Sequence, residues 1–419
     1  MIRPISEVFL ADNEAFGDLQ DDKNINRDSK KTTPLNDRVA LDELELNYHT
    51  NTIVFNGINK VVQTIMSSQI ELTAHDPKVF AYFTNFINRL GAYGAKITWK
   101  ELLESIFRHQ VIYGRTWVEN IYNKRGNSIV DWDIIDPKKM DYAKDNNGKI
   151  VLDNNGNPIG YFEILPFMDS ELTERENTKK LPPRVVRPST GKSIFFYPNQ
   201  IAMIKLYTVG DGFYGIGLIE PIYKTSIRKM NIEEGLANAI YRHGFPIMWA
   251  KLGDMNHEPT PQQIQTMLTK LKDINFKQEI ATPYFYDLQM MESKQTDKIK
   301  DNLEYFQDSE VSGLGVPETI ATGNSDASSY ASLSLQLEMF KLGLRDIVNK
   351  TFSAIEKYMF LPICQLEGFK EVPKLKWMAP EMAEEKELKI KRILEYIKLG
   401  ILQPNNKAID YIKKIEGLE

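Results

Sequence analysis

The sequence predicts an α+β protein that is mainly helical, and two patterns support this prediction. Apolar residues recur at steps of three and four along two long segments of the second half, residues 219–243 and 330–360, as on one face of a helix. Strand patterns gather in the first half, at 116–135 and 193–209, instead of alternating one by one with helices. Strands and helices that occur in separate runs are typical of the α+β class.

The first half begins with a polar segment and continues with three predicted helices. Residues 1–52 are rich in charge and poor in periodicity, so we expect an extended arm that only a partner would order. Apolar residues recur at helical spacing from Thr52 onward, which predicts one helix, and again over 78–90, which predicts a second. A third helix should begin at Thr98, because its hydroxyl can cap the helix while Glu101 completes a capping box.

Two strand patterns follow the third helix. The segments TWVENIY (116–122) and NSIVDWDII (127–135) are separated by turn residues, which predicts a hairpin. Alternation places Asp131 and Asp133 on one face of the second strand. With Asp136 they resemble a metal-binding carboxylate cluster, but no histidine or further acidic motif accompanies them. We interpret them as a solvated strand face.

Two clusters of turn residues lie eight residues apart, DNNGK (145–149) and DNNGN (153–157). The second cluster fits the first positions of a calcium-binding loop. That loop needs glycine at its sixth position, where this chain has Pro158. We therefore expect two turns and no calcium site.

The second half is mostly helical. The helix at 219–243 would be about 37 Å long at 1.5 Å per residue. The elements expected after it are a strand at 247–252, a helix at 261–276, a strand at 280–288, a helix at 297–312, the long helix at 330–360, a strand in KLKWMAP and a charged helix at 382–399. Small and polar residues, GLGVPETIATGNSDASS, separate two of these helices.

Composition excludes several classes of function. The chain has 419 residues, a formal net charge of −5 and one cysteine, Cys364. No intrachain disulfide and no thiolate metal cage can form from one thiol. Proteins that bind nucleic acid tightly usually have a net positive charge, so we do not expect this chain to bind DNA with high affinity. We also expect no secretory signal, because the N-terminus lacks an apolar core, and no membrane span, because no run of about 18 apolar residues occurs.

A search for catalytic residues finds none. The five histidines are scattered, and no two lie three to five residues apart; they are His49, His75, His109, His243 and His257. No nucleophile elbow, GK[ST] phosphate loop or zinc-helix motif is present. We predict no catalytic residue, no cofactor and no metal site.

The segment GDGFYG formally matches a dinucleotide-binding fingerprint. Gly210, Gly212 and Gly215 follow a predicted strand and precede a helix, and Glu233 and Glu234 lie about 20 residues on. The acidic residue of that fingerprint ends a second parallel strand, whereas these glutamates fall within the predicted helix. A turn that needs positive φ explains the glycines as well. A nucleotide- or cofactor-dependent enzyme that uses this turn remains the alternative.

Taken in order, several segments resemble the portal proteins of tailed double-stranded DNA viruses of bacteria and archaea, over roughly residues 53–415. YGIGLIEPIYKTSIRKMNIEEGLANAIYRHGFP resembles the family's glycine turn and long stem helix. VSGLGVPETIATG resembles the junction before the tunnel loop, and WMAPEMAEEKELKIKRILEYIKLGILQPNNKAIDYI resembles the crown. FRHQVIYGRTWVEN and IIDPKKMDYAKDNNGK are similar to the wing. Each motif alone is weak, and their common order makes the resemblance specific.

The resemblance implies a portal fold assembled as a ring. Its parts would be an N-terminal arm at 1–52, a mixed α/β wing at 53–218, a stem helix at 219–243, a clip at 244–292, a second stem helix at 293–316, a tunnel loop at 317–329, a long wing helix at 330–372 and a crown at 373–419. The residues implied to face DNA are Thr322, Gly323, Asn324, Ser325, Asp326, Ala327 and Ser328, and those implied to dock a motor or adaptor are Lys270, Lys272 and Lys277.

The implied partners are those of a non-enzymatic channel subunit at one capsid vertex. They are further copies of the chain in a ring of twelve, double-stranded DNA, the terminase large subunit, the major capsid protein and a head–tail adaptor. The implied location is the virion, with the host cytoplasm during assembly. Twelve copies would carry a charge of 12 × −5 = −60, which suits DNA that slides rather than binds. A further alternative is a membrane-peripheral or scaffold protein with a helical hairpin, which would stay monomeric or dimeric.

Overall fold

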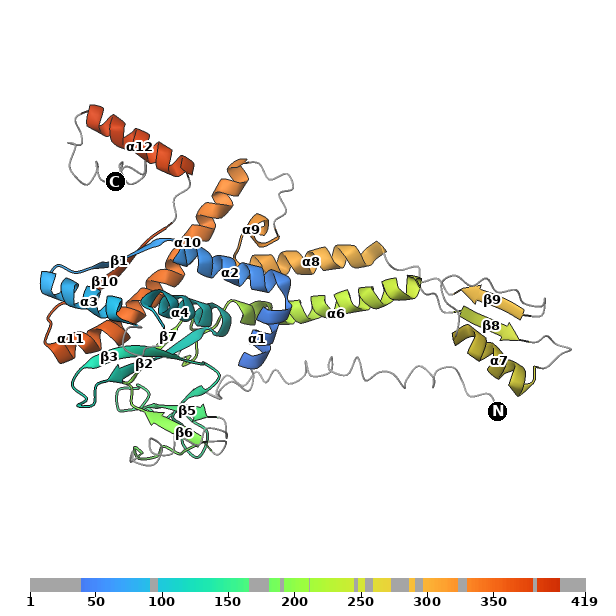
Figure 1. Ribbon diagram of the computed structural model, residues 1–419, viewed down its shortest axis with the longest axis horizontal. Helices are drawn as coiled ribbons and strands as arrows, with labels where there is room; N and C mark the ends of the chain where they lie inside the picture. The colour runs from blue at the N-terminus through green and yellow to red at the C-terminus, as the bar shows by residue number, and fades with distance from the viewer. Residues whose placement is uncertain are drawn as a thin grey trace. The chain divides into compact units, whose positions relative to one another are not determined.

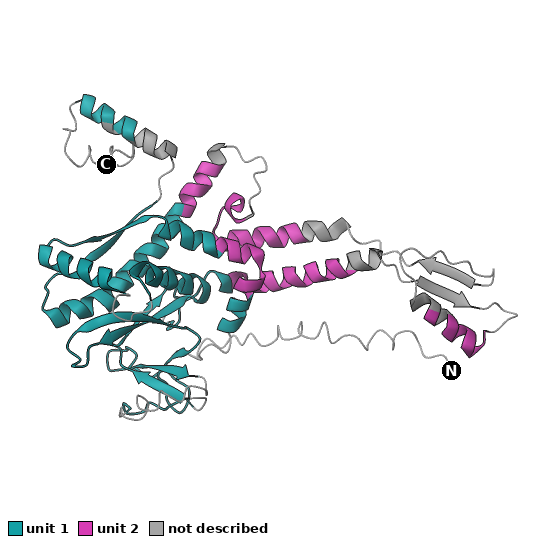
Figure 2. Cartoon of the chain, viewed as in Figure 1, with its two compact units in different colours: residues 1–46, 58–220, 341–419 teal, residues 47–57, 221–340 magenta. Residues whose placement is uncertain are grey.

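The computed structural model describes residues 39–90, 97–165, 181–188, 192–210, 212–244, 248–252, 259–272, 286–290, 297–322, 330–379 and 383–399. The chain divides into two compact units, coloured separately in Figure 2. Unit 1 contains residues 1–46, 58–220 and 341–419, and unit 2 contains residues 47–57 and 221–340.

The elements follow one another as Figure 1 labels them. Four helices contribute residues to both units: α1 (Leu41–Thr50), α2 (Thr52–Met66), α6 (Ile219–Gly244) and α10 (Tyr330–Ile355). The other elements of unit 1 are β1 (Gln69–Thr73), α3 (Pro77–Arg89), α4 (Trp99–Tyr113), β2 (Arg115–Tyr122), β3 (Ile129–Ile135), β4 (Met140–Tyr142), β5 (Tyr161–Leu165), β6 (Lys192–Phe196), β7 (Ile201–Lys205), the π-helical turn η5 (Glu356–Phe360), α11 (Leu361–Glu367), β10 (Lys374–Met378) and α12 (Ala383–Lys398). Those of unit 2 are β8 (Met248–Leu252), α7 (Pro261–Lys272), β9 (Tyr286–Met290), α8 (Asp297–Leu314) and α9 (Glu318–Thr322).

This content confirms the predicted class, a mainly helical α+β protein. The two long helices are present as α6 and α10, although α10 passes into a π-helical turn at Glu356 and then into α11. The predicted strand–helix–strand module is present as β8, α7 and β9, with β8 and β9 paired antiparallel.

Among its described residues, unit 1 contains three small antiparallel sheets, with strand orders β3-β2-β7, β4-β5-β6 and β1-β10. The predicted hairpin is confirmed, because β2 and β3 pair with Trp117 opposite Ile135. The pairing of β1 with β10 joins residues about 300 positions apart in the sequence, with Gln69 opposite Met378. Local sequence patterns do not predict this pairing.

The core beside the β2–β3 hairpin is aromatic. Trp132 is buried, and its ring contacts Phe86, Trp99 and Phe360 at centroid distances of 4.8, 5.7 and 5.9 Å. Its indole N–H donates to the side-chain oxygen of Asn120 at 3.0 Å, so the one polar group of this ring is satisfied. Three separate elements, α3, α4 and η5, are thereby packed around one side chain of β3.

Capping residues set the helix ends as the sequence predicts. Thr98 and Glu101 form the complete capping box at the start of α4, and Gly114 ends that helix with a φ of 75°. Both predicted turns are also confirmed: the Asp145 carboxylate accepts from the backbone N–H of Lys149, and the Asp153 carboxylate accepts from that of Asn157.

The expected extended arm is wrong for residues 41–50, which form the helix α1. Leu44 and Tyr48, one turn apart, are both buried, and Asp42 and Glu43 lie in the first turn, where the helix dipole favours negative charge. The buried apolar stripe of α1 consists of only two residues, and a helical period cannot be recognised from two residues. Residues 1–38 of the predicted arm lie outside the described residues.

The glycines of GDGFYG are needed for two different reasons. Gly210 has a φ of 57°, as a turn with positive φ requires. Gly215 does not have a positive φ; instead, a Cβ on it would lie 1.9 Å from the carbonyl oxygen of Gly114. Positive φ therefore explains Gly210, whereas Gly215 allows the loop before α6 to approach the end of α4.

Candidate functional site

Most of the predicted site residues fall where little or nothing is described. Thr322 is the last residue of α9, and Gly323, Asn324, Ser325, Asp326, Ala327 and Ser328 lie outside the described residues. Lys270 and Lys272 belong to α7, and Lys277 lies outside the described part. The predicted tunnel loop and clip contacts therefore remain predictions.

Unit 2 contains a buried polar cluster that the sequence patterns described above do not predict. Lys229 of α6 places its ammonium 3.0 Å from the carboxylate of Glu310 on α8. The side chain of Lys229 is 8% exposed and that of Glu310 is 0% exposed. Buried charges are costly unless they are paired and hydrogen-bonded, so each of these side chains depends on the other.

Asn51 extends the cluster to a third helix. Its amide N–H donates to the second oxygen of the Glu310 carboxylate at 2.7 Å, and its own oxygen accepts from the backbone N–H groups of Ile53 and Val54 at 3.0 and 3.3 Å. Asn51 thus caps the N-terminus of α2 and donates to a carboxylate on α8. Both oxygens of Glu310 are satisfied, one by Asn51 and one by Lys229.

Two glycines bring the helices around this cluster close together. A Cβ on Gly57 of α2 would lie 2.7 Å from the side chain of Leu314 on α8, and a Cβ on Gly313 would lie 2.2 Å from Ile222 on α6. The helices α2, α6 and α8 therefore pack through positions that lack a side chain. This close approach allows the short Asn51 side chain to contact α8.

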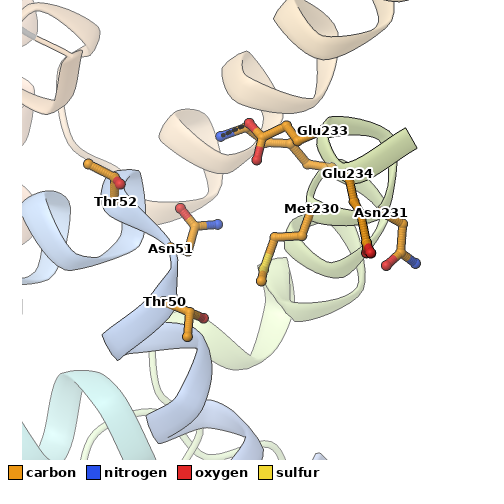
Figure 3. Close-up of a pocket in the computed structure, with 8 residues that line it drawn as sticks. Thr50, Asn51, Thr52, Met230, Asn231, Glu233 and Glu234 are labelled. Atoms are coloured by element: carbon orange, nitrogen blue, oxygen red, sulfur yellow. Dashed lines mark ion pairs between the residues drawn. The ribbon is translucent and has the colours of Figure 1, made fainter. Parts of the chain in front are cut away.

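A cavity of about 370 Å³ opens beside the cluster. Figure 3 shows the residues around it: Thr50, Asn51 and Thr52 come from the junction of α1 and α2, and Met230, Asn231, Glu233 and Glu234 come from α6. Lys229 also lines the cavity and lies 3.7 Å from Glu233, with which it forms an ion pair one helical turn apart. The walls are therefore polar, with the Met230 side chain as an apolar surface.

The cavity carries a negative charge. Its lining contains one ammonium, that of Lys229, and two carboxylates, those of Glu233 and Glu234. The ammonium is already bonded to Glu310, whose carboxylate is fully buried. These four groups together have a formal charge of −2, so the cavity favours a cation over a phosphate or carboxylate ligand.

The structure gives no support to a dinucleotide site at GDGFYG. All strand pairs in the described residues are antiparallel, whereas the fingerprint belongs to a parallel sheet. Glu233 and Glu234 lie within α6, as predicted, and not at the end of a strand. The described residues also contain no group of three or more histidine, cysteine, aspartate or glutamate side chains arranged to hold a metal ion.

The buried ion pair had a signal in the sequence. Lys229 lies three residues after Ser226 and seven after Ile222, on the face of α6 that these residues bury. Glu310 lies four residues before the buried Leu314, on the same face of α8. A charged residue within an apolar stripe indicates an oppositely charged partner on a facing helix.

A family model described as portal protein of Mu bacteriophage matches residues 49–417. The sequence has no match among the curated proteins. Within the described part of the chain, no helix combines the length and apolar character needed to cross a bilayer.

Three similar solved structures show the same fold at low sequence identity. A chain of the virion of a native gene transfer agent particle has 12% identity and a TM-score of 0.57, with 88% of this chain and 92% of that chain covered. A chain in the neck of an empty particle, computed with C6 symmetry, has 12% identity and a TM-score of 0.59, with 90% and 94% covered. A chain in the neck of the native particle, computed with C12 symmetry, has 11% identity and a TM-score of 0.57, with 87% and 90% covered.

Proposed function

The chain belongs to the family described as portal protein of Mu bacteriophage, and we propose that twelve copies of it form the ring-shaped channel through which double-stranded DNA enters and leaves a capsid. The family match over residues 49–417 is the main support for this proposal, because it includes nearly all of the chain after the N-terminal segment. The chain is accordingly a structural portal subunit. We propose that it has no catalytic activity of its own.

The number of subunits is supported by similarity of fold. One similar chain comes from a particle neck computed with C12 symmetry, and another from a neck computed with C6 symmetry. A ring of twelve satisfies both symmetries. Closed rings of this kind use one heterologous interface, in which each copy contacts the next through two different surfaces.

Unit 2 itself supports assembly. In α6, Ile222, Ser226 and Lys229 are buried, but the residues from Glu233 to Gly235 are exposed. In α8, Val311 and Leu314 are buried near the C-terminal end, whereas Tyr305 is 68% exposed. Long helices that bury only part of their length within one subunit are expected to complete their packing against neighbouring subunits.

We assign the parts of the chain as the resemblance implies. The helices α6 and α8 would form the stem, the β8–α7–β9 module the clip, residues 317–329 the tunnel loop, α10 with α11 the long wing helix, and residues 373–419 the crown. The acidic balance of the chain supports a channel that lets DNA pass, because a lining with few cations makes few of the counterion-releasing contacts that hold a duplex.

The proposed partners follow from this assignment. The clip would dock the terminase large subunit during packaging and a head–tail adaptor afterwards, and the wing would contact the major capsid protein. The ring would assemble in the host cytoplasm and remain at the portal vertex of the virion. The motor's ATPase activity would belong to the terminase chain.

One measurement tests the assembly directly. A ring of twelve has a mass of about 580 kDa (12 × 48.3 kDa), which sedimentation of the purified chain would detect. Negative-stain electron microscopy should show closed rings with a central channel. A chain that sediments as a monomer over a wide range of protein and salt concentrations would contradict the proposal.

A further inference from the structure

Among the described residues that line the cavity beside Lys229, two carboxylates outnumber one ammonium. Glu233 and Glu234 are exposed, and both line the cavity. The ammonium of Lys229 lies closer to Glu310, at 3.0 Å, than to Glu233, at 3.7 Å. A second cation at this cavity would therefore be attracted by carboxylates that the subunit itself leaves incompletely neutralised.

The same helix carries a cation on a different edge. Arg228 is exposed and does not line the cavity. It precedes Glu234 by six residues, so the two side chains lie about 120° apart around the helix and about 9 Å apart along it. One copy of α6 thus presents a basic edge and an acidic edge, and the two cannot pair with each other within that copy.

We propose that, in the assembled ring, Arg228 of one copy inserts into the cavity of the next copy and pairs with the carboxylates of Glu233 and Glu234. The inference rests on the proposed ring. A heterologous ring interface joins two different surfaces of the chain, so a basic edge of one copy can meet an acidic edge of the next. An α6 helix with a basic edge and an acidic edge fits such an interface, because the pairing repeats identically around the ring.

The chemistry of the cavity fits a guanidinium better than a small ion. Arginine presents several donors in a planar fork that pairs with carboxylates, and its weak hydration lowers the cost of entering a cavity. The Asn231 side-chain oxygen offers a further acceptor, and Met230 offers an apolar surface for the arginine side chain. Packed helices lie about 8–10 Å apart, a distance that an arginine and a glutamate side chain can span between them.

The test is a charge exchange between the two edges. Arg228→Glu alone, and Glu233→Arg with Glu234→Arg, should each raise the concentration needed for half-maximal ring assembly by at least about tenfold, because like charges then face each other. The triple exchange, with all three substitutions in one chain, restores opposite charges at every interface. It should recover most of the assembly that the separate variants lose.

Two controls separate this inference from its alternatives. Arg125→Glu makes the same charge change at an exposed position of the β2–β3 turn and should leave assembly unchanged. Circular dichroism and urea unfolding of the unassembled chains should show that every variant folds.

The outcomes distinguish the inference from the proposed function. If the parent chain forms rings and both separate variants assemble equally well, the cavity does not bind Arg228, while the ring proposal stands. If the separate variants fail and the triple exchange does not recover, the two edges do not face each other and the inference is wrong. If the parent chain forms no ring under any condition, the proposed function itself fails.

Discussion

The ammonium of Lys229 and the carboxylate of Glu310 form a buried ion pair at 3.0 Å that links α6 to α8 across 81 residues of sequence. The two helices can pack in this way only if both residues are present, because each charge alone would be buried without its nearest opposite charge. Since α6 and α8 are the proposed stem helices, the pair fixes their register in every subunit of the ring.

Removing one partner of this pair should destabilise the subunit strongly. We expect Lys229→Met to lower the free energy of unfolding by about 3–5 kcal/mol, because it leaves the Glu310 carboxylate buried without its ammonium. The double variant Lys229→Met with Glu310→Leu should recover much of this loss, apart from about 1–3 kcal/mol for the unpaired amide of Asn51. Urea unfolding of the unassembled chain measures both values. A double variant that is less stable than the single variant would contradict this account, because it would show that the Glu310 carboxylate stabilises the fold even without its ammonium.

Stability should also depend on pH through His109. Burial lowers the pKa of His109 from 6.5 to about 4, although the carboxylates of Asp136 and Glu45 act in the opposite direction. Between these two values the unfolded chain binds a proton that the folded chain does not, so stability is lost as pH falls from 6.5 towards 4. The contribution of His109 to this loss is at most about 3 kcal/mol.

The His109→Phe variant should remove this part of the pH dependence. Phenylalanine keeps the aromatic contact with Tyr113, whose ring lies 5.7 Å from that of His109, and cannot be protonated. Urea midpoints at pH 7.5 and pH 4.5 should therefore differ less in the variant than in the parent. The matched control is His49→Phe, at an exposed histidine of α1. Equal pH dependence in His109→Phe and the parent would contradict the assignment.

Two glycine substitutions should have opposite effects. Gly215→Ala should destabilise by roughly 2–3 kcal/mol, because the added methyl would meet the carbonyl oxygen of Gly114 at 1.9 Å and backbone must move. Gly235→Ala should stabilise by about 0.5–1 kcal/mol, since Gly235 lies within α6 with nothing within 4 Å of an added Cβ. Thermal unfolding of the unassembled chain measures both. A neutral Gly215→Ala would show that the loop before α6 can move away from α4 at little cost.

The elements that are predicted correctly depend on residues that lie close together in the sequence. The capping box of Thr98 and Glu101 and the β2–β3 hairpin each need residues only a few positions apart. The π-helical turn at 356–360 was missed, because it interrupts a helix without changing its apolar stripe. The α1 helix was missed because its stripe consists of Leu44 and Tyr48 alone.

The site depends instead on contacts between distant segments. The partners of Glu310 are Asn51, 259 residues away, and Lys229, 81 residues away. The positions of Lys229 and Glu310 on buried helix faces indicate that each needs a partner, but only the packing of α2, α6 and α8 brings them together with Asn51. The close approach of Gly215 to Gly114 is equally non-local, so the sequence predicts the turn but not the packing that requires it.

The predicted motor contact can be tested through the lysines of the clip. Replacing Lys270, Lys272 and Lys277 together by glutamate should weaken binding of the terminase large subunit at least about tenfold, because reversed charges at an interface are repulsive. Surface plasmon resonance with assembled rings measures the affinity at low and moderate salt.

A matched triple variant controls for net charge. Lys124→Glu, Arg125→Glu and Lys149→Glu change the same number of charges at exposed turns of the proposed wing. This variant should bind the terminase as the parent does. If the clip variant also keeps the parent's affinity, the motor docks on another surface.

The tunnel-loop prediction starts from a break that the sequence imposes. Gly315 has a φ of 66° directly after α8, and Pro317 biases Val316 away from helical angles. After the short helix α9 comes GNSDAS, residues 323–328, a run of small and polar residues without lysine or arginine. Such residues gain little from burial, so they suit a surface that faces solvent or a water-filled channel. We predict that they surround the DNA in the ring.

Shortening residues 323–328 should leave ring assembly intact and reduce the DNA packaged per capsid, because the stem and wing would make the subunit contacts while the loop contacts DNA. Asp326→Lys should slow translocation in a salt-sensitive way, since it adds twelve cations around the duplex in a ring of twelve. Asp326→Asn, which removes the charge without adding a cation, is the matched control and should have a smaller effect. An in vitro packaging assay at low and moderate salt measures all three variants. If rings with the shortened loop package and retain DNA as the parent does, the loop is a passive connection, because a segment that contacts the moving duplex could not be removed without effect.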